Sequence, residues 1–295
     1  MAGVLAEEMD ISRTMAGTKA PGNARGLRVA FLTLPTLAFL LVFFILPVGY
    51  VLFLSVSSPT VSLDHFTRIF STPLYLRVLW NTFLTSFFVT VFCLLLGYPL
   101  AYVIARRNDI WSRLLLSAVI ISFWTGFLVR TYAWLVILGN RGPVVGAIDA
   151  LGLGPAPQLL FTSFSSAVGM THILLPYMVL SLLSVMKRFD ERYIRAAESL
   201  GARPFTAFRL IYLPLSLPGV VNGSILIFTI CLGFYVTPIL LGTPSDMMIS
   251  QLINQQIEEL LNFGFASALA VVLLITTAVI LAIYNRFAGL DRLWG

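Results

Sequence analysis

The sequence predicts an all-α integral membrane protein with six transmembrane helices. Hydrophobic residues make up 58% of the 295 residues and charged residues only 11%, and the mean hydropathy is +0.92. These values are far from those of a soluble domain. Six stretches contain the roughly 20 apolar residues that a helix needs to cross a hydrocarbon core about 30 Å thick, and none alternates like a barrel strand. The stretches are Phe31–Leu54, Asn81–Ala105, Leu114–Leu138, Phe164–Met186, Leu217–Leu241 and Phe265–Tyr284.

The first stretch is too long and lies too far from the N-terminus for a cleaved signal peptide, so we expect it in the mature protein. Residues 1–30 mix Ala, Gly, Thr and charged residues without a period, which predicts a disordered tail. The six-span domain is then expected over residues 31–286, with a second short tail at residues 287–295.

The distribution of Lys and Arg predicts that both termini are cytoplasmic. With the N-terminus inside, 15 of the 19 Lys and Arg residues lie on the inner side, and only Arg68, Arg77 and Arg141 lie outside, which leaves Arg130 within a span. Positive charges near spans are retained in the cytoplasm. The net charge of +6 is therefore a topology signal, and we expect no nucleic-acid partner.

This topology places three outer loops at residues 55–80, 139–163 and 242–264. In the last of these, Met247–Leu261 has apolar residues at near-helical spacing with Gln, Asn and Glu opposite, which predicts an amphipathic helix. Two interpretations remain open. The helix either rests on lipid or neighbouring spans, or forms a gate wall or a landing site for an external partner.

The sequence offers no metal site and no expected disulfide. Cys93 and Cys231 both fall inside predicted spans, where a thiol behaves as a small apolar group. His65 and His172 are far apart in the chain, and no Cys/His cluster has metal-ligand spacing.

The loop at residues 187–216 is the longest polar inner segment and has a distinct pattern. Tyr193–Leu200 is predicted to form a short helix with one apolar stripe. Gly201 can adopt the positive φ that ends such a helix, and Pro204 is well placed to begin another. The pattern therefore predicts two short helices joined by a sharp turn.

Pro214 and Pro218 are expected to separate the second short helix from the fifth span, because proline cannot continue the helical hydrogen-bond ladder. The predicted product is a rigid knob beneath the bilayer that fits a groove on a cytoplasmic protein. The alternative is an amphipathic linker on the inner leaflet.

Within this loop, the pattern Ala-Ala-x-x-x-Gly followed by Leu-Pro and Pro-Gly resembles the EAA loop of ATP-binding-cassette (ABC) importer permeases. Six spans with the loop between the fourth and fifth also resemble this family. The resemblance implies a type I importer permease fold, half of a solute path, and a coupling helix inserted in a groove of an ATPase subunit. The matching positions are Ala196, Ala197, Leu200, Gly201, Ala202, Phe208, Leu213, Pro214, Pro218 and Gly219.

The segments TFLTSFFVT, FWTGFLVRTYAW and FYVTPILLG are most similar to spermidine/putrescine-type permeases, to the first of their two permease subunits. The resemblance implies a location in the bacterial inner membrane and a heterodimer with a second permease subunit. It further implies two ATP-binding subunits that hold ATP and Mg, and a periplasmic solute-binding protein. The implied solute is a polyamine, and other small cationic or zwitterionic solutes remain open.

The chain departs from the family pattern at Arg195, which stands where the glutamate that names the motif is expected. Either Glu191 or Glu198 replaces that glutamate, or the partner ATPase carries a compensating acid, which is the interpretation we favour. The residues that we assign to the coupling loop are Arg195, Ala196, Ala197, Glu198, Leu200, Gly201, Ala202, Phe208 and Pro214.

The chain has no GxxxxGK[ST] phosphate loop, so we expect no ATP hydrolysis, no catalytic residue and no cofactor on this chain. A secondary transporter driven by an ion gradient is the alternative function, and it predicts carboxylates inside the spans, where this chain has none. A membrane-embedded enzyme would need a catalytic constellation, and Arg130 with His172 does not make one.

Four residues are candidates for the solute path: Trp124, Arg130, Tyr132 and Tyr235. Arg130 is either a structural hydrogen-bonding centre, which we favour, or a solute contact. His172 is expected to be an interhelical hydrogen-bonding residue rather than a proton relay. The aromatic residues either form an interfacial belt or surround a cationic solute by cation-π attraction.

Overall fold

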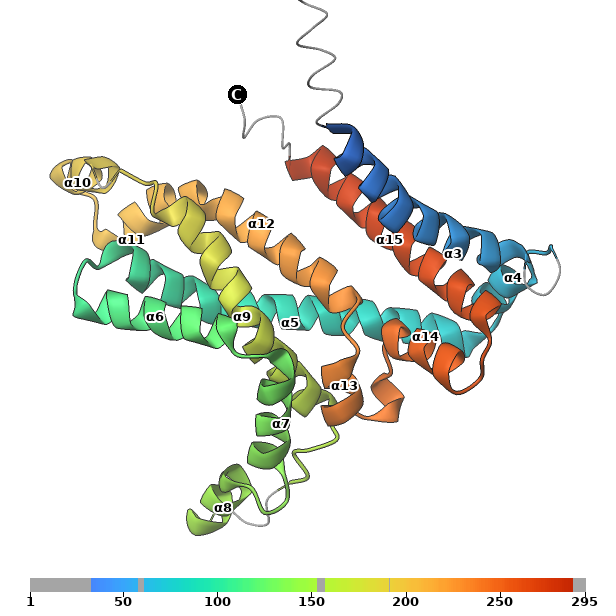
Figure 1. The fold of residues 1–295 in the computed structure, drawn as a ribbon. Coiled ribbons are helices and arrows are strands. Elements are labelled where there is room, and N and C mark those ends of the chain that lie inside the picture. The colour runs from blue at the N-terminus through green and yellow to red at the C-terminus, as the bar shows by residue number, and fades with distance from the viewer. Residues whose placement is uncertain (1–32, 58–60, 153–156, 191, 289–295) are drawn as a thin grey trace, which may run out of the picture. The chain divides into compact units, whose positions relative to one another are not determined.

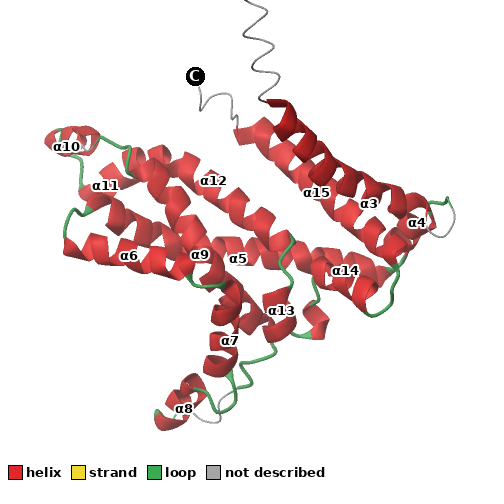
Figure 2. Cartoon of the chain, viewed as in Figure 1, coloured by secondary structure: helices red, strands yellow, loops and turns green. Residues whose placement is uncertain are grey.

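The computed structural model describes residues 33–57, 61–152, 157–190 and 192–288, and every regular element in these ranges is a helix (Figure 2). The predicted N-terminal tail and most of the C-terminal one lie outside the described residues. The described residues divide into two compact units, one within residues 1–53 and the other within residues 54–295.

The first unit contributes most of one helix, Thr33–Ser57, which agrees with the first predicted span. The helix contains a π-helical turn at Leu41–Ile45, and α3 follows at Leu46–Ser57. Pro47 has no N–H to donate to the carbonyl four residues earlier, and a π turn is one way to accommodate this loss. Most apolar side chains of this helix are exposed, as suits a surface that faces lipid.

The second unit contains the remaining helices. They are α4 (Asp64–Ser71), α5 (Pro73–Arg106), α6 (Ile110–Trp124), α7 (Phe127–Leu138), α8 (Pro143–Ala150), α9 (Ser163–Met186), α10 (Arg192–Ser199), α11 (Pro204–Ala207), the π turn η2 (Phe208–Tyr212), α12 (Leu213–Leu232), α13 (Val236–Leu241), the 3₁₀ turn η3 (Pro244–Asp246), α14 (Ile249–Glu258) and α15 (Phe263–Ala288).

Helices α5, α9 and α12 pack together as the core of this unit (Figure 1). Met178 of α9 is fully buried at their centre, between Gly97 of α5 and Gly223 of α12. A Cβ at Gly97 would lie 2.9 Å from Met178 Cγ, and one at Gly223 would lie 2.7 Å from Met178 Sδ. Helices in lipid gain little from the hydrophobic effect, and small residues let their backbones approach closely. The glycines therefore hold the core together by close packing.

Five helices are individually long and apolar enough to cross a membrane, counted over the described residues, and the count reaches six if a bent pair forms one span. That pair is Ile110–Trp124 with Phe127–Ala150, bent by 100°. The third predicted span, Leu114–Leu138, is therefore not one continuous helix, because it breaks at Thr125 and Gly126. The fifth predicted span is also interrupted, since α12 ends at Leu232 and α13 begins at Val236.

Pro214 and Pro218 do not separate a short helix from the fifth span, which corrects the expectation from the sequence. The helix continues from Pro204 to Leu232. The π turn η2 precedes Pro214 just as the turn at Leu41–Ile45 precedes Pro47, and in both cases a Leu-Pro pair follows. The wider turn accommodates the missing N–H without ending the helix.

The segments predicted as outer loops 55–80 and 242–264 contain helices. Helix α5 begins at Pro73, and its 34 residues reach about 50 Å, well beyond a hydrocarbon core of about 30 Å. Helix α14 confirms the amphipathic helix predicted within Met247–Leu261. Its buried Ile249 and Leu252 pack in one cluster with Phe265 of α15, which supports the interpretation that it rests on neighbouring spans.

Candidate functional site: a coupling elbow and two interrupted helices

Helices α10 and α11 form a sharp elbow, which we define as residues 192–207. The N–H of Ala202 donates to the carbonyl of Ala197, and the N–H of Gly201 donates to that of Glu198, both at 3.0 Å. This pair of bonds is the Schellman arrangement, which requires a left-handed residue after the helix. Gly201 has φ +86°, and Pro204 begins α11. The predicted first helix and turn are confirmed, and Pro204 begins the second helix as predicted, although that helix continues into α12.

The elbow is attached to the core through a cluster of aromatic rings. Phe208 lies in ring contact with Tyr98 at 6.2 Å and Tyr102 at 5.5 Å, both on α5. Tyr212 contacts Tyr102 at 4.9 Å and Phe189 at 5.4 Å. Phe208 and Tyr212 stack on each other at 5.9 Å. We call these five residues the aromatic cluster; it links the elbow segment to α5 and to the end of α9.

The inner side of the elbow packs on the core, and its outer side is uncovered. Ile194 and Ala207 are buried, and Ala197 packs against the same core. In contrast, Leu200 is 89% exposed and Phe205 is 73% exposed. Two large apolar side chains thus project from the elbow, one before its turn and one at the beginning of α11.

The structure places the other predicted loop residues around this surface. Ala196 and Glu198 are exposed, whereas Ala202 and Phe208 are half-buried. Arg195 is a residue of α10, and Pro214 is exposed in the first turn of α12.

The two interrupted helices meet at their breaks. Phe127, the first residue of α7, lies in ring contact with Phe234, which follows α12, with centroids 6.4 Å apart. A hollow of 200 Å³ opens there. Its lining residues are Phe127, Gly233, Phe234, Tyr235 and Val236. Of the four predicted path residues, only Tyr235 lines this hollow.

Arg130 is 7% exposed and is bonded to backbone carbonyls. One Nη donates to the carbonyl of Ile173 at 3.2 Å and of His172 at 3.5 Å, and the other donates to Thr125 at 3.0 Å. Pro176, four residues after His172, has no N–H, so the His172 carbonyl lacks its helical donor. Arg130 therefore satisfies carbonyls freed by a proline in α9 and by the break after α6. These bonds support its structural role.

Side-chain hydrogen bonds hold the segments beyond the breaks. Thr131 of α7 and Thr237 of α13, both fully buried, lie 3.0 Å apart through their hydroxyls. Trp134 Nε1 donates to His172 Nδ1 at 3.1 Å, in agreement with the expectation that His172 bonds between helices. The structure leaves Trp124 83% exposed, and it leaves Tyr132 exposed as well.

Sequence reasoning missed the aromatic cluster and the backbone carbonyls to which Arg130 donates. Tyr98, Tyr102 and Tyr212 are spread over two distant segments, and no local pattern connects them. The position of Pro176 four residues after His172 was a usable signal, because it marks a carbonyl in need of a donor.

Comparisons with known proteins agree with this architecture. A family model described as the binding-protein-dependent transport system inner membrane component matches residues 94–290. The spermidine/putrescine transport system permease protein PotB of Haemophilus influenzae is 32% identical over 77% of this chain and 79% of that protein. PotB of Escherichia coli is 31% identical over 78% and 83%.

The fold is also found in solved transporters. A crystal structure of a bacterial ABC transporter involved in import of the acidic polysaccharide alginate superposes with a TM-score of 0.72. The superposition covers 90% of this chain and 96% of the transporter chain at 18% sequence identity, which shows that the two chains have the same fold. These findings favour an importer over a secondary transporter. The chain belongs to the binding-protein-dependent transport system inner membrane component family and is a multi-pass inner-membrane permease of the ABC importer class.

Proposed function

We propose that this permease forms one half of a heterodimeric solute path, with a second permease subunit and two ATP-binding subunits. The ATP-binding subunits hold ATP and Mg, and a periplasmic solute-binding protein delivers the solute. The observation that carries this proposal is the elbow, with its buried inner side and its exposed Leu200 and Phe205. ATP binding draws the two ATP-binding subunits together, the elbows follow, and the helices shift between inward-facing and outward-facing states.

An exposed apolar side chain on a rigid turn is the kind of anchor that fills a pocket on a partner. Leu200 stands directly before Gly201, and the Schellman bonds fix the backbone around it. Its backbone is thus held in place before a partner binds, which lowers the entropy cost of docking.

We expect Leu200→Asp to reduce the amount of ATP-binding subunit that co-purifies with the permease by at least tenfold, because a charge would enter an apolar pocket. The measurement is the subunit ratio of the complex purified through the permease. Val61→Asp is the matched control, since Val61 is 82% exposed and lies outside the elbow. Full retention of the ATP-binding subunits in Leu200→Asp would show that the elbow does not dock there.

Arg195 is proposed to face an acidic residue on the partner ATP-binding subunit. The family glutamate at this position implies a charge contact, and the sign of the charge is inverted in this chain.

Charge reversal tests this pairing. We expect Arg195→Glu to weaken co-purification of the ATP-binding subunit about tenfold, because like charges would then oppose each other. Arg195→Gln should have a smaller effect. If Arg195→Glu instead strengthens the complex, the partner carries a basic residue and the proposed compensation is absent.

The hollow at the two breaks is proposed as part of the solute path. Helix breaks leave backbone groups free to meet water or solute, and non-helical backbone at membrane depth occurs where it is buried or lines a cavity. Tyr235 lines the hollow, and Trp124 ends α6 beside the other break. We assign Tyr235 and Trp124 as candidate solute contacts, Tyr132 as an interfacial aromatic residue, and Arg130 as a positioning residue.

Removing the Arg130 guanidinium should destabilise the permease rather than change its selectivity. Arg130→Met leaves the carbonyls of His172 in α9 and of Thr125 after α6 without the guanidinium donor, at a cost of roughly 2 kcal/mol or more. We expect a lower thermal unfolding midpoint and an unchanged ratio of uptake between two competing solutes. Arg77→Met, at an exposed position of α5, is the control. A stable Arg130→Met complex with altered selectivity would assign Arg130 to solute contact.

The solute is proposed to be a polyamine, because the relatives at 31–32% identity are named as spermidine/putrescine permeases. Aromatic rings such as Tyr235 suit an ammonium group through cation-π attraction. The predicted spans of this chain contain no Asp or Glu. A buried counter-charge would therefore come from the second permease.

The solute class is tested on the cognate solute-binding protein. We expect spermidine or putrescine to raise its thermal unfolding midpoint, because a ligand that binds only the folded state stabilises it. Amino acids and opines serve as the comparison. A midpoint that shifts with an amino acid or an opine, and not with polyamines, would overturn the polyamine assignment and leave the importer assignment intact.

A further inference from the structure

A basic cavity lies beside the elbow, at the ends of α5 and α9 and the beginning of α6. Its volume is 410 Å³. Four of its lining residues are cationic: Arg106, Arg107, Arg113 and Lys187. Asn108 adds an amide, and none of the lining residues is acidic. Ile194 of the elbow forms part of the wall, so the cavity and the elbow share one end of the core.

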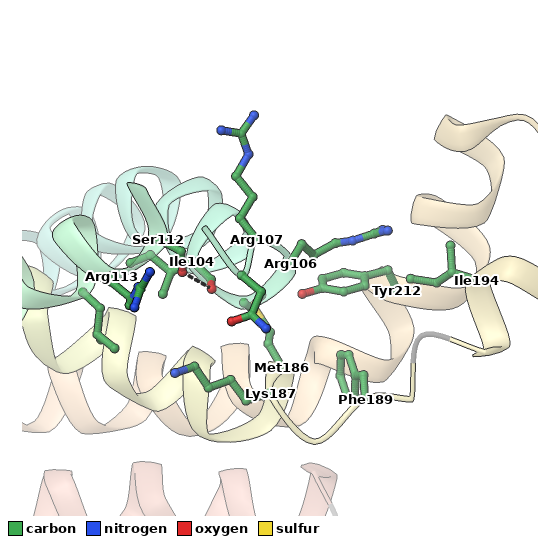
Figure 3. A pocket seen from close by; sticks show the side chains of 13 residues that line it. Ile104, Arg106, Arg107, Ser112, Arg113, Met186, Lys187, Phe189, Ile194 and Tyr212 are labelled. Atoms are coloured by element: carbon green, nitrogen blue, oxygen red, sulfur yellow. Dashed lines mark hydrogen bonds between the residues drawn. The ribbon is translucent and has the colours of Figure 1, made fainter. Parts of the chain in front are cut away.

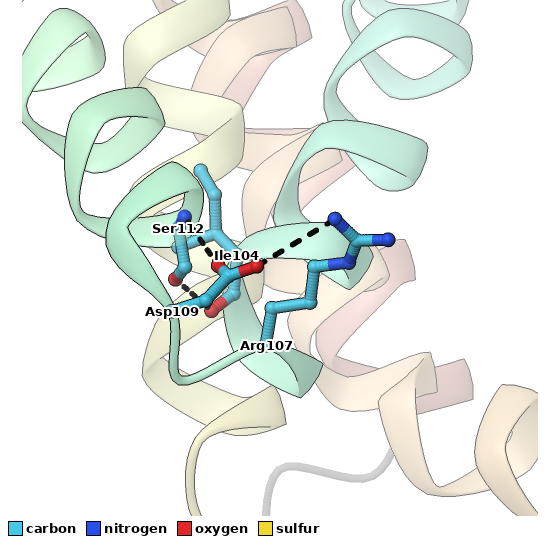
Figure 4. Close-up of polar contacts among 4 residues, drawn as sticks. All are labelled: Ile104, Arg107, Asp109 and Ser112. Atoms are coloured by element: carbon cyan, nitrogen blue, oxygen red, sulfur yellow. Dashed lines mark hydrogen bonds and ion pairs between the residues drawn. The ribbon is translucent and has the colours of Figure 1, made fainter.

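The described carboxylates next to this cavity are already engaged. Asp109 pairs with Arg107 at 3.7 Å and accepts the N–H of Ser112 at 3.0 Å, which caps α6 (Figure 4). Asp190 pairs with Arg192 at 3.8 Å. Among the described residues, Arg113 and Lys187 have no ion-pair partner. The cavity therefore carries positive charge that the described part of the chain does not neutralise.

A buried hydroxyl in the cavity wall also lacks a partner. Tyr212 is 3% exposed, and its Oη has no hydrogen-bond partner among the described residues. In Figure 3 this hydroxyl points toward the side of the cavity where Arg113 and Lys187 lie, whereas Arg107 points away. A buried hydroxyl without a partner is costly. An oxyanion in the cavity would accept its hydrogen bond.

The surface next to the cavity has the character of a membrane interface. Trp111 is 63% exposed at the start of α6, and Ile110 and Leu114 beside it are exposed too. Exposed tryptophan is typical of the headgroup level of a bilayer, and exposed aliphatic residues suit acyl chains. Ser112 and Arg113, which line the cavity, lie between Trp111 and Leu114 in the sequence.

We propose that this cavity binds the phosphate group of an anionic phospholipid, with Arg113 and Lys187 as the charge partners and the Tyr212 hydroxyl as a donor. Basic pockets between helices on the cytoplasmic side suit such headgroups. This proposal rests on the proposed function in one respect, because it requires the elbow end of the helices to face the cytoplasm. A lipid bound there would hold the base of the elbow against α5 and α6. A soluble phosphate compound offers the same chemistry, and the experiment separates the two sources.

The experiment uses the intact importer complex in neutral detergent and counts bound lipid by native mass spectrometry. The probes are phosphatidylglycerol, phosphatidylcholine and inorganic phosphate. We expect phosphatidylglycerol to bind the permease and phosphatidylcholine not to bind. The double variant Arg113→Gln/Lys187→Gln should bind phosphatidylglycerol about 30-fold more weakly, at about 1 kcal/mol for each lost charge. Tyr212→Phe should bind it roughly tenfold more weakly, since it loses one hydrogen bond to a charged group.

The matched control is Arg188→Gln/Arg286→Gln, which removes the same charge from exposed positions outside the cavity lining. Equal loss of lipid in both double variants would overturn the proposal, because it would show that the anionic lipid is attracted by the net positive charge of the permease and not by this cavity. Absence of bound phosphatidylglycerol and phosphate, or occupation of the cavity by an acidic segment of the ATP-binding subunit, would also overturn it. Displacement of the lipid by inorganic phosphate at equal affinity would support the phosphate site and assign it a soluble source.

The same spectra report the subunits of the complex. Loss of the ATP-binding subunits from the wild-type complex would contradict the proposed function, whereas the lipid count on the permease is read independently. The two failures are therefore distinguishable.

Discussion

The stacked and edge-on rings of the aromatic cluster are the contact on which the rest of the structure depends. A docking element can move a membrane domain only if it is packed firmly against the helices of that domain. Phe208 and Tyr212 provide this attachment, because their rings meet Tyr98 and Tyr102 of α5 and Phe189 at the end of α9. Ring pairs in such geometries contribute about 0.5–1.5 kcal/mol each beyond the area that they bury.

The attachment continues into the core by close packing and one polar contact. The Tyr98 hydroxyl lies 2.8 Å from the Ser216 hydroxyl of α12. The preceding residue, Gly97, packs closely against Met178 of α9. Interiors packed at this density respond to a displacement as a unit rather than by gradual deformation. A shift of the elbow is therefore expected to move α5, α9 and α12 together.

At the other end of the core, two helices break at segments that contain glycine, a proline within α9 frees a carbonyl, and side chains satisfy the freed backbone groups. The break between α6 and α7 and the missing N–H of Pro176 both leave carbonyls that the Arg130 guanidinium satisfies. Non-helical backbone is tolerated at membrane depth where such partners exist. Arg130, which would be costly in lipid, thus satisfies a carbonyl at the break that precedes Phe127, one of the residues that line the hollow.

The sequence predicted the helical class and the elbow because both depend on local properties. Apolar runs report spans directly, and the turn at Gly201 follows from glycine's access to positive φ. Sequence reasoning failed where proline was treated as a helix terminator. Pro214 is accommodated by a π turn, whereas the break at Gly126 contains no proline at all.

Contacts between distant segments were also out of reach of sequence reasoning. Two bonds of Arg130 reach carbonyls 42 and 43 positions away, and Tyr102 and Tyr212 of the aromatic cluster are more than a hundred positions apart. Such pairs depend on helix packing angles and registers that no local pattern encodes.

The most direct test of the central claim is the uptake of solute per ATP hydrolysed by the reconstituted importer carrying Phe208→Ala. The aromatic-cluster account predicts that the ATP-binding subunits stay bound, because Leu200 and Phe205 are untouched, while uptake per ATP falls at least tenfold. Leu210→Ala, an exposed position on the same π turn, should behave as the wild type. Unchanged uptake per ATP in Phe208→Ala would contradict the account, since the elbow would then drive the core without the ring contacts.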